Sequence, residues 1–350
     1  MKPDFEIKNK KVGCIDPVFI IAELSANHNQ NFDNAVKLIK EAKKAGADAV
    51  KLQTYTPDTI TINCNNEFFQ IKQGTIWDGR ILYDLYKEAY TPWEWQPKLK
   101  EIAENEGLIC FSSPFDKTAV DFLEKMNVPA YKIASFEITD IPLIEYIASK
   151  GKPVIISTGI ATLGDIEEAI NACIRMNNKQ IALLKCTSEY PSPLNEVNLK
   201  TIPNMIETFK TIVGLSDHTL GISVPVAAVA LGAKIIEKHF TLSRSMGGPD
   251  AAFSLEPEEF SQMVRSVREV EKALGDVSYE LSAKTMKSRE FSRSLFVVKD
   301  VKEGEIFTEE NVRSIRPGFG LHPKYYKYIL GKKAAKDIDK GTPLNWDLID

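Results

Sequence analysis

The 350-residue sequence lacks most features of secreted, membrane and nucleic-acid-binding proteins. Its five cysteines are scattered and include no C-x-x-C pair, which argues against a disulfide framework and a cysteine zinc site. No apolar run approaches the roughly 18 residues of a membrane span, and the polar N-terminus lacks the apolar core of a signal peptide. The net charge of -4 gives no basic surface for nucleic acid or an anionic membrane. We therefore expect a protein of the reducing cytoplasm, with no nucleic-acid or membrane partner.

The sequence also lacks a phosphate-binding loop and has few histidines. The sequence contains no glycine-rich phosphate loop, so an anionic substrate would have to be held by side chains. It contains only four histidines, and two of them, His218 and His239, follow short apolar runs in IVGLSDH and KIIEKH. Both runs are typical of strands. The two histidines are therefore expected to share one site at the ends of neighbouring strands.

Apolar runs and helical patterns alternate eight times along most of the chain. Runs without inward–outward alternation indicate strands buried on both faces, hence a parallel sheet covered by helices. Eight such units predict a (β/α)8 TIM barrel, with a doubly wound open sheet as the alternative. The predicted strands are 18–24, 49–53, 108–113, 130–135, 153–159, 181–187, 212–218 and 234–239. The predicted helices are 32–45, 93–105, 117–126, 141–150, 163–176, 198–209, 224–231 and 257–273.

The character of the sequence changes after Gly275. We expect residues 1–275 to form the barrel, residues 276–291 a polar, basic linker, and residues 292–350 a small domain of short strands and turns. Within the barrel, the long mixed segment 55–90 is expected to be a functional loop or lid, because so long a connection is uncommon in a compact domain.

The active site of such a barrel forms at the carboxyl ends of its strands, and every predicted strand here ends in polar residues. A lysine at a strand end is by default a solvated charge. Lys51 and Lys132, however, are flanked by apolar residues and should point inward, where an ammonium group needs an anion. Hydroxyl groups from other strands would complete a phosphate and carboxylate pocket. The candidate hydroxyl residues are Ser112, Ser113, Ser135, Ser157, Thr158, Thr187, Ser188 and Ser216.

Two histidines on adjacent strand ends favour a divalent metal site over two ordinary core residues. Such an ion could polarise a carbonyl group, and Glu23 and Asp250 are carboxylate candidates near the barrel mouth. Lysines that bind an anionic substrate, a metal ion that polarises a carbonyl group and a carboxylate that activates water are together typical of an aldol-like condensation. Two alternatives remain: a Schiff-base aldolase with a lysine nucleophile, and a non-catalytic sugar-binding protein. The binding protein is disfavoured, because burying so many charges without function is costly.

Motifs along the whole chain resemble the sialic acid synthase family. They are AELSANHNQ, KIASFE, STGIAT, CTSEYPSP, GLSDHTLG, EKHFTL and GGPDAAFSLEP, in that order. The tail, from SRSLFVV to GTPL, resembles the family's C-terminal antifreeze-like domain (SAF, β-clip). The resemblance implies a transferase that condenses phosphoenolpyruvate with an N-acylated amino sugar, giving a nonulosonic acid and phosphate. It also implies a divalent ion, typically Mn²⁺, with Co²⁺ or Mg²⁺ as alternatives.

The same resemblance implies roles for individual residues. His218 and His239 would be the metal ligands, and Glu23 would contact the reacting centre and handle water. The residues implied around phosphoenolpyruvate are Lys51, Ser113, Lys132, Ser135, Ser188 and Ser216. Ser157 is a further candidate for substrate binding.

Tyr190 and Asp250 would contact the sugar or water at the metal. Arg316, in IRPGFG, would reach the acyl group of the sugar from the partner subunit, which implies a domain-swapped homodimer. The first-strand motif ELSANHNQ, with TIWDGRILYDLYKEAYTPWEW and SMGGPDAAFSLEP, is similar to the pseudaminic acid branch of the family. The sugar implied is 2,4-diacetamido-2,4,6-trideoxy-β-L-altropyranose, a diacetamido-trideoxy hexose. The N-acetylneuraminate and legionaminic acid branches are the alternatives.

Overall fold

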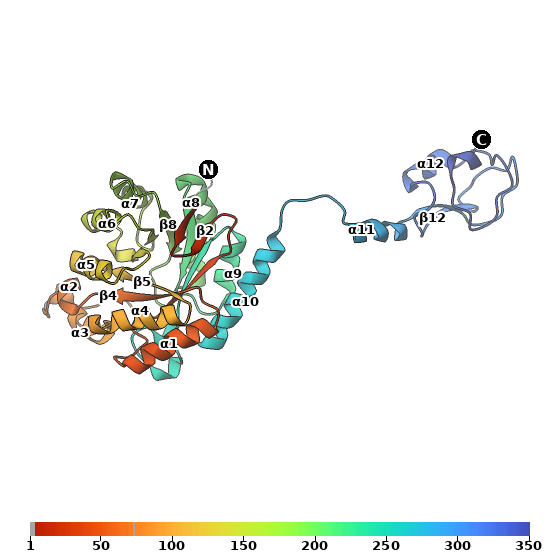
Figure 1. Cartoon of the computed structure of the whole chain (residues 1–350). Coiled ribbons are helices and arrows are strands. Elements are labelled where there is room, and N and C mark those ends of the chain that lie inside the picture. The colour runs from red at the N-terminus through yellow and green to blue at the C-terminus, as the bar shows by residue number, and fades with distance from the viewer. Residues whose placement is uncertain (1–3, 73) are drawn as a thin grey trace. The chain divides into compact units, whose positions relative to one another are not determined.

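The computed structural model describes residues 4–72 and 74–350, which form two compact units divided after Gly275. The larger unit is a closed barrel of eight parallel strands surrounded by helices (Figure 1). The smaller unit contains a two-stranded antiparallel sheet with its own hydrophobic core. The predicted TIM barrel with a small C-terminal β domain is therefore confirmed.

The barrel strands follow one another in chain order, and the last pairs with the first. They are β3 (Phe19–Glu23), β4 (Ala49–Thr54), β5 (Ile109–Pro114), β6 (Tyr131–Ile133), β7 (Val154–Ser157), β8 (Ile181–Cys186), β9 (Ile212–Asp217) and β10 (Ile235–His239). Nearly all their residues are buried, because side chains fill the barrel and helices cover its outside. The register places Glu23 between His239 and Lys51 on the neighbouring strands. Polar groups distant in sequence are thus brought to the same height along the barrel axis.

One long helix follows each barrel strand, seven of them leading to the next strand and the last closing the barrel unit. They are α1 (Phe32–Lys44), α4 (Gln96–Asn105), α5 (Lys117–Lys125), α6 (Ile141–Ala148), α7 (Leu163–Arg175), α8 (Thr201–Phe209), α9 (Ser223–Ala230) and α10 (Pro257–Leu274). In α1 the residues Ala35, Leu38, Ile39 and Ala42 are buried, which is the spacing of one helix face. The predicted helix 93–105 begins only at Gln96, because the three preceding residues form a 3-10 turn.

Two segments differ from a simple barrel. Residues 4–13 form a hairpin of β1 (Asp4–Ile7) and β2 (Lys10–Gly13), whose buried side chains join the barrel core. The polar composition of these residues gave no strand prediction. The long segment predicted as a loop or lid contains two short helices, α2 (Pro57–Ile60) and α3 (Leu82–Ala89).

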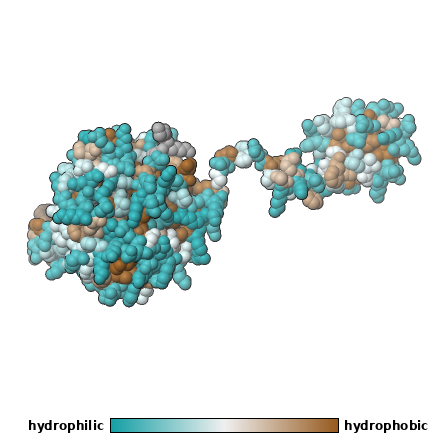
Figure 2. All heavy atoms as spheres, viewed as in Figure 1, coloured by the Kyte–Doolittle hydropathy of each residue, from teal (hydrophilic) through white to brown (hydrophobic). Residues whose placement is uncertain are grey.

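The first helix of the smaller unit is α11 (Ala283–Ser288), which lies within the expected linker. Its strands β11 (Ser294–Val297) and β12 (Val312–Ile315) pair antiparallel, and α12 (Tyr326–Ile329) follows. Figure 2 shows apolar residues on the surface of the segment that follows α10, where Val277 is 94% exposed.

All five cysteines are free thiols. Among the described residues, no helix has both the length and the hydropathy that a membrane span requires.

Candidate active site

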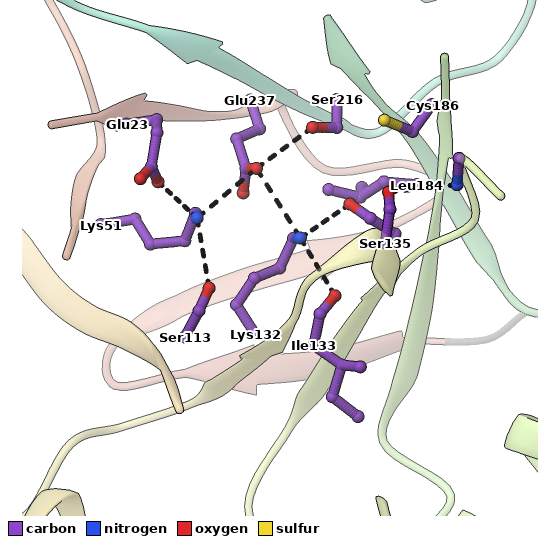
Figure 3. Close-up of polar contacts among 12 residues, drawn as sticks. Glu23, Lys51, Ser113, Lys132, Ile133, Ser135, Leu184, Cys186, Ser216 and Glu237 are labelled. Atoms are coloured by element: carbon purple, nitrogen blue, oxygen red, sulfur yellow. Dashed lines mark hydrogen bonds and ion pairs between the residues drawn. The ribbon is translucent and has the colours of Figure 1, made fainter. Parts of the chain in front are cut away.

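Two buried lysines face one carboxylate inside the barrel (Figure 3). Lys51 of β4 is 4% exposed and Lys132 of β6 is 2% exposed. The Nζ atom of each lies 3.7 Å from Oε1 of Glu237 on β10. Burial of two ammonium groups is costly unless negative charge compensates them. The barrel interior is therefore built to hold anionic oxygen atoms.

Each lysine also donates to a serine on the next strand. Lys51 Nζ donates to Ser113 Oγ at 3.3 Å, and Lys132 Nζ donates to Ser157 Oγ at 2.7 Å. A hydroxyl oxygen that accepts from an ammonium group keeps its own proton for another acceptor. These two serines can therefore donate to an anion held by the lysines.

Glu237 is absent from the site predicted from the sequence, although it lies at the centre of the observed one. Ser216 Oγ donates to its Oε1 at 3.2 Å, and its Oε2 has no hydrogen-bond partner among the described residues. Burial alone would raise the pKa of Glu237, but Lys132 and Lys51 outweigh it and the pKa is lowered. Glu237 is thus a carboxylate that balances the charges of two lysines.

The alternation of side chains along β10 could have identified Glu237. Successive strand residues point to opposite faces, so an inward His239 implies an inward Glu237 and an outward Lys238. Lys238 is fully buried and donates to Asp217 and to the carbonyl of Thr219. It is therefore neither solvated nor part of the site, and the default expectation for a strand-end lysine is wrong here.

Ser135 and Ser188 come together around a glycine. The Gly159 N–H donates to Ser135 Oγ at 3.1 Å. A Cβ atom at Gly159 would lie 2.7 Å from Ser135 Oγ and 2.0 Å from Ser188 Oγ, closer than real atoms approach. Only glycine allows the backbone after β7 to approach both hydroxyl groups. The two serines thus lie close together beside the backbone that follows β7.

Glu23 joins this group from β3. It forms an ion pair with Lys51 and accepts a hydrogen bond from Gln53 Nε2 at 3.1 Å. Burial raises the pKa of Glu23 to about 7, with Lys51 opposing the shift and Glu237 adding to it. A carboxyl group with a pKa near neutrality can take up and release a proton at physiological pH.

Hydrogen bonds connect Glu23 to Asp250, far away in the sequence. Gln53 Nε2 donates to Glu23 and also to Ser25 Oγ at 2.9 Å, and Ser25 Oγ in turn donates to Asp250. Burial raises the pKa of Asp250, while the hydrogen bond from Ser25 opposes the shift. The two candidate carboxylates are therefore coupled through two neutral side chains.

The two histidines of the strand ends lie side by side, with ring centroids 5.2 Å apart. His218 Nδ1 lies 3.1 Å from the carbonyl oxygen of Thr187, which can only accept, so Nδ1 carries the proton. The Nε2 lone pair of a neutral His218 then remains available. Burial lowers the pKa of His239 well below its usual value, and its Nδ1 has no partner within residues 4–72 and 74–350. Neutral His239 can therefore act as a nitrogen ligand. At His218 the effect of burial is outweighed by Cys186 and the Thr187 carbonyl, so its pKa is raised, and it would bind an ion with release of the Nε2 proton.

These two histidines fit a divalent ion. Each offers a ring nitrogen, and His218 is oriented by its hydrogen bond to a carbonyl, as metal-ligating histidines commonly are. In the described part of the chain, no three His, Cys, Asp or Glu side chains form a ready metal cluster. Further ligands would therefore come from substrate and water, which leaves the coordination positions that a Lewis acid needs.

Aromatic rings border the histidines. The ring centroid of Tyr190 lies 4.5 Å from that of His218 and 5.2 Å from that of Phe253. The ring centroids of Phe253 and His239 are 4.9 Å apart. Burial raises the pKa of Tyr190, so its hydroxyl stays protonated and can donate. Aromatic rings therefore pack directly beside both histidines.

Two remaining residues lie elsewhere. His28 is buried, with Nε2 3.1 Å from Thr91 Oγ1 and Nδ1 accepting from the Gln30 N–H. It therefore anchors the first loop. Arg316 is exposed in the smaller unit, directly after β12.

Comparisons with known proteins cover nearly the whole chain. The NeuB family model matches residues 38–279, and the SAF domain model matches residues 292–350. A pseudaminic acid synthase of Campylobacter jejuni is 53% identical over 327 residues, which are 93% of this chain and 95% of that protein. One from Helicobacter pylori is 48% identical over 337 residues, covering 96% and 99%. A crystal structure of an N-acetylneuraminic acid synthetase from Leptospira borgpetersenii, in complex with citrate, matches with a TM-score of 0.74 at 33% identity, covering 83% of this chain and 96% of that one.

Proposed function

The chain belongs to the NeuB family, and from this premise we propose that it is a pseudaminic acid synthase. It condenses phosphoenolpyruvate with 2,4-diacetamido-2,4,6-trideoxy-β-L-altropyranose, giving pseudaminic acid and phosphate. The choice of sugar is supported by 48% to 53% identity to pseudaminic acid synthases over nearly their full length. The observation that carries the chemistry is the pair of buried lysines beside two buried histidines.

Phosphoenolpyruvate suits the lysine side of the site because it carries both a phosphate and a carboxylate. Lys51 and Lys132 provide the charge, and Ser113 and Ser157 provide hydroxyl donors beside them. Ser135, Ser188 and Ser216 would supply further donors from neighbouring strands. An entering anion competes with Glu237 for both ammonium groups, so substrate charge replaces protein charge inside the barrel.

The sugar suits the histidine side. His218 and His239 would hold a divalent ion, which we propose is Mn²⁺ and which would supply Lewis-acid polarisation of the aldehyde of the opened sugar. The same barrel mouth holds Tyr190, whose hydroxyl can donate to the sugar, and Asp250, which can accept from it. Holding both substrates here converts a reaction between two molecules into one between oriented groups.

The reaction balances with groups of this site. C3 of phosphoenolpyruvate forms a bond to the aldehyde carbon with the electron pair of the C2–C3 double bond, which leaves C2 electron-poor and the aldehyde oxygen in need of a proton. Water adds its oxygen to C2 and gives one proton to Glu23, whose pKa of about 7 allows it to accept that proton and pass it on to the former aldehyde oxygen. The bond from C2 to the phosphate oxygen then breaks as the oxygen from water becomes the ketone oxygen, and the second water proton leaves with phosphate. Lys51 and Lys132 stabilise the departing charge in a water-poor interior.

A substrate panel tests this function directly. Phosphate release would be measured with phosphoenolpyruvate and each of three sugars: the diacetamido-trideoxy altrose, the legionaminic acid precursor and N-acetylmannosamine. We expect the altrose to have the highest kcat/KM. Turnover with N-acetylmannosamine alone would contradict the choice of sugar. No phosphate release with any sugar would favour the aldolase or the binding protein.

We further propose that the enzyme is a domain-swapped homodimer. Large apolar side chains stand exposed on four segments that follow barrel strands, at the same end as the site. They are Phe136, Leu163, Leu194 and Leu220, each at least 60% exposed. Exposed apolar surface around a binding site usually marks an interaction surface. The partner subunit's small domain would cover it and contribute an arginine at position 316.

Arg316→Ala should therefore impair use of the sugar far more than binding of phosphoenolpyruvate. Loss of one charged hydrogen bond is worth about 1.5–3 kcal/mol, so KM for the sugar should rise roughly tenfold to a hundredfold. KM for phosphoenolpyruvate should stay within about twofold. Arg313→Ala, on the same strand region and also exposed, is the control and should change neither value. Equal losses for both substrates would count against this role.

A further inference from the structure

A closed turn in the long segment between β4 and α4 carries a tryptophan to the edge of the site. The Ile71 N–H donates to the carbonyl of Arg80 at 2.9 Å. Within the turn, the Asp78 carboxylate accepts from the backbone and hydroxyl of Thr75 at 2.9 and 3.0 Å. These bonds fix the backbone on both sides of Trp77. The turn therefore fixes the backbone from which the indole ring projects.

Trp77 connects this segment to two other parts of the barrel mouth. Its Nε1 donates to the carbonyl of Pro249 at 3.1 Å, in the loop after β10. Its ring lies 5.4 Å from the ring of Tyr190, in the loop after β8. Because the indole N–H is already bonded to protein, the remaining indole surface can offer only apolar contact.

Trp77, Tyr190 and Phe253 form a continuous set of rings, here called the aromatic wall. At its inner end, Tyr190 and Phe253 lie 4.5 Å and 4.9 Å from the rings of His218 and His239. At its outer end lies Trp77. A sugar whose aldehyde carbon is at the histidines would extend its remaining carbons along this wall.

We propose that Trp77 is a specificity-determining residue whose ring packs against the methyl group at C6 of the sugar or the methyl group of its C4 acetamido group. This inference rests on the proposed function, since the diacetamido-trideoxy hexose carries methyl groups at C6 and on its two acetamido groups. Contact between an aromatic ring and a methyl group removes apolar surface from water and so favours binding. A hydroxyl at the same place would lose hydrogen bonds to water without replacement. One such group in an apolar pocket changes selectivity about 10-fold to 200-fold.

The test compares Trp77→Phe and Trp77→Ala with the wild type. Three sugars are used: the diacetamido-trideoxy altrose, its counterpart with a hydroxyl at C6, and its counterpart with a hydroxyl in place of the C4 acetamido group. Phosphate release gives kcat/KM for each, and KM for phosphoenolpyruvate is measured in parallel. Trp93→Phe is the control, because Trp93 bonds the Tyr55 carbonyl and stacks on Phe122, away from the aromatic wall.

We expect Trp77→Ala to lower the preference for the altrose over one counterpart by about tenfold or more, with KM for phosphoenolpyruvate within about twofold. The counterpart affected identifies the methyl group, and Trp77→Phe should keep part of the preference. Unchanged preferences in both variants of an active enzyme overturn the inference alone. Loss of phosphoenolpyruvate binding in both variants also overturns it, because the role of Trp77 is then structural. A wild type that prefers N-acetylmannosamine in the earlier panel overturns the proposed function and, with it, this inference.

Discussion

Replacing His218 with alanine is expected to lower kcat/KM by on the order of a thousandfold at saturating divalent ion, because polarisation of the carbonyl is worth several kcal/mol. His218 has the geometry of a ligand, since its Nδ1 is bonded to the Thr187 carbonyl and its other nitrogen is available. The variant should also show little dependence on added metal. The measurement is phosphate release across a titration of Mn²⁺.

His28→Gln is the matched control for this experiment. His28 is also a buried histidine, but both its nitrogens are bonded outside the site. Its replacement should lower thermal stability and leave the dependence on metal unchanged. Full activity of the wild type in excess chelator would refute the metal assignment. An equal loss in the two variants would mean that the effect of His218 is structural.

The second large effect is expected at the two-lysine centre. Lys132→Met removes half of the positive charge that faces the anion and leaves Glu237 with one lysine instead of two. Breaking a buried ion pair typically costs 3–5 kcal/mol, so the variant should lose stability. Its kcat/KM for phosphoenolpyruvate should fall at least about a hundredfold.

A double replacement separates stability from catalysis. Lys132→Met with Glu237→Gln removes one charge of each sign, so the melting temperature should recover relative to Lys132→Met alone. Activity should not recover, because the anion still lacks a lysine. Lys238→Met is the control: it breaks a buried pair with Asp217 outside the site and should cost stability without raising KM for phosphoenolpyruvate. Recovery of turnover in the double variant would contradict anion binding by Lys132.

The barrel was predictable from the sequence because its strands are apolar on both faces. Runs such as VFIIAEL and PVIIS show no alternation of apolar and polar residues, which distinguishes them from strands with one face at the surface. Each observed strand begins and ends within two residues of the predicted limits. The inward orientation of Lys51 and Lys132 followed from the same apolar flanks. The hairpin at residues 4–13 could not be predicted this way, because only a few of its side chains face the core.

Contacts between side chains of separate strands and loops were not predictable from local patterns. The chain of hydrogen bonds from Glu23 through Gln53 and Ser25 to Asp250 joins residues that no periodicity relates. The position of Trp77 likewise depends on a turn and a carbonyl on separate segments. Glu237 is different, because two-residue alternation from His239 places it inside the barrel and needs only the sequence. Periodicity thus fixes the direction of a strand side chain, whereas loop contacts require the folded structure.

The most direct test of the account follows the bridging oxygen of phosphoenolpyruvate. The proposed condensation breaks the C2–O bond and leaves the bridging oxygen on phosphate. Phosphoenolpyruvate labelled with oxygen-18 at that position would be turned over with the diacetamido-trideoxy altrose, and the phosphate analysed by mass spectrometry. We predict that the released phosphate carries the label. Unlabelled phosphate, with the label retained in the sugar acid, would mean P–O cleavage and would contradict the account.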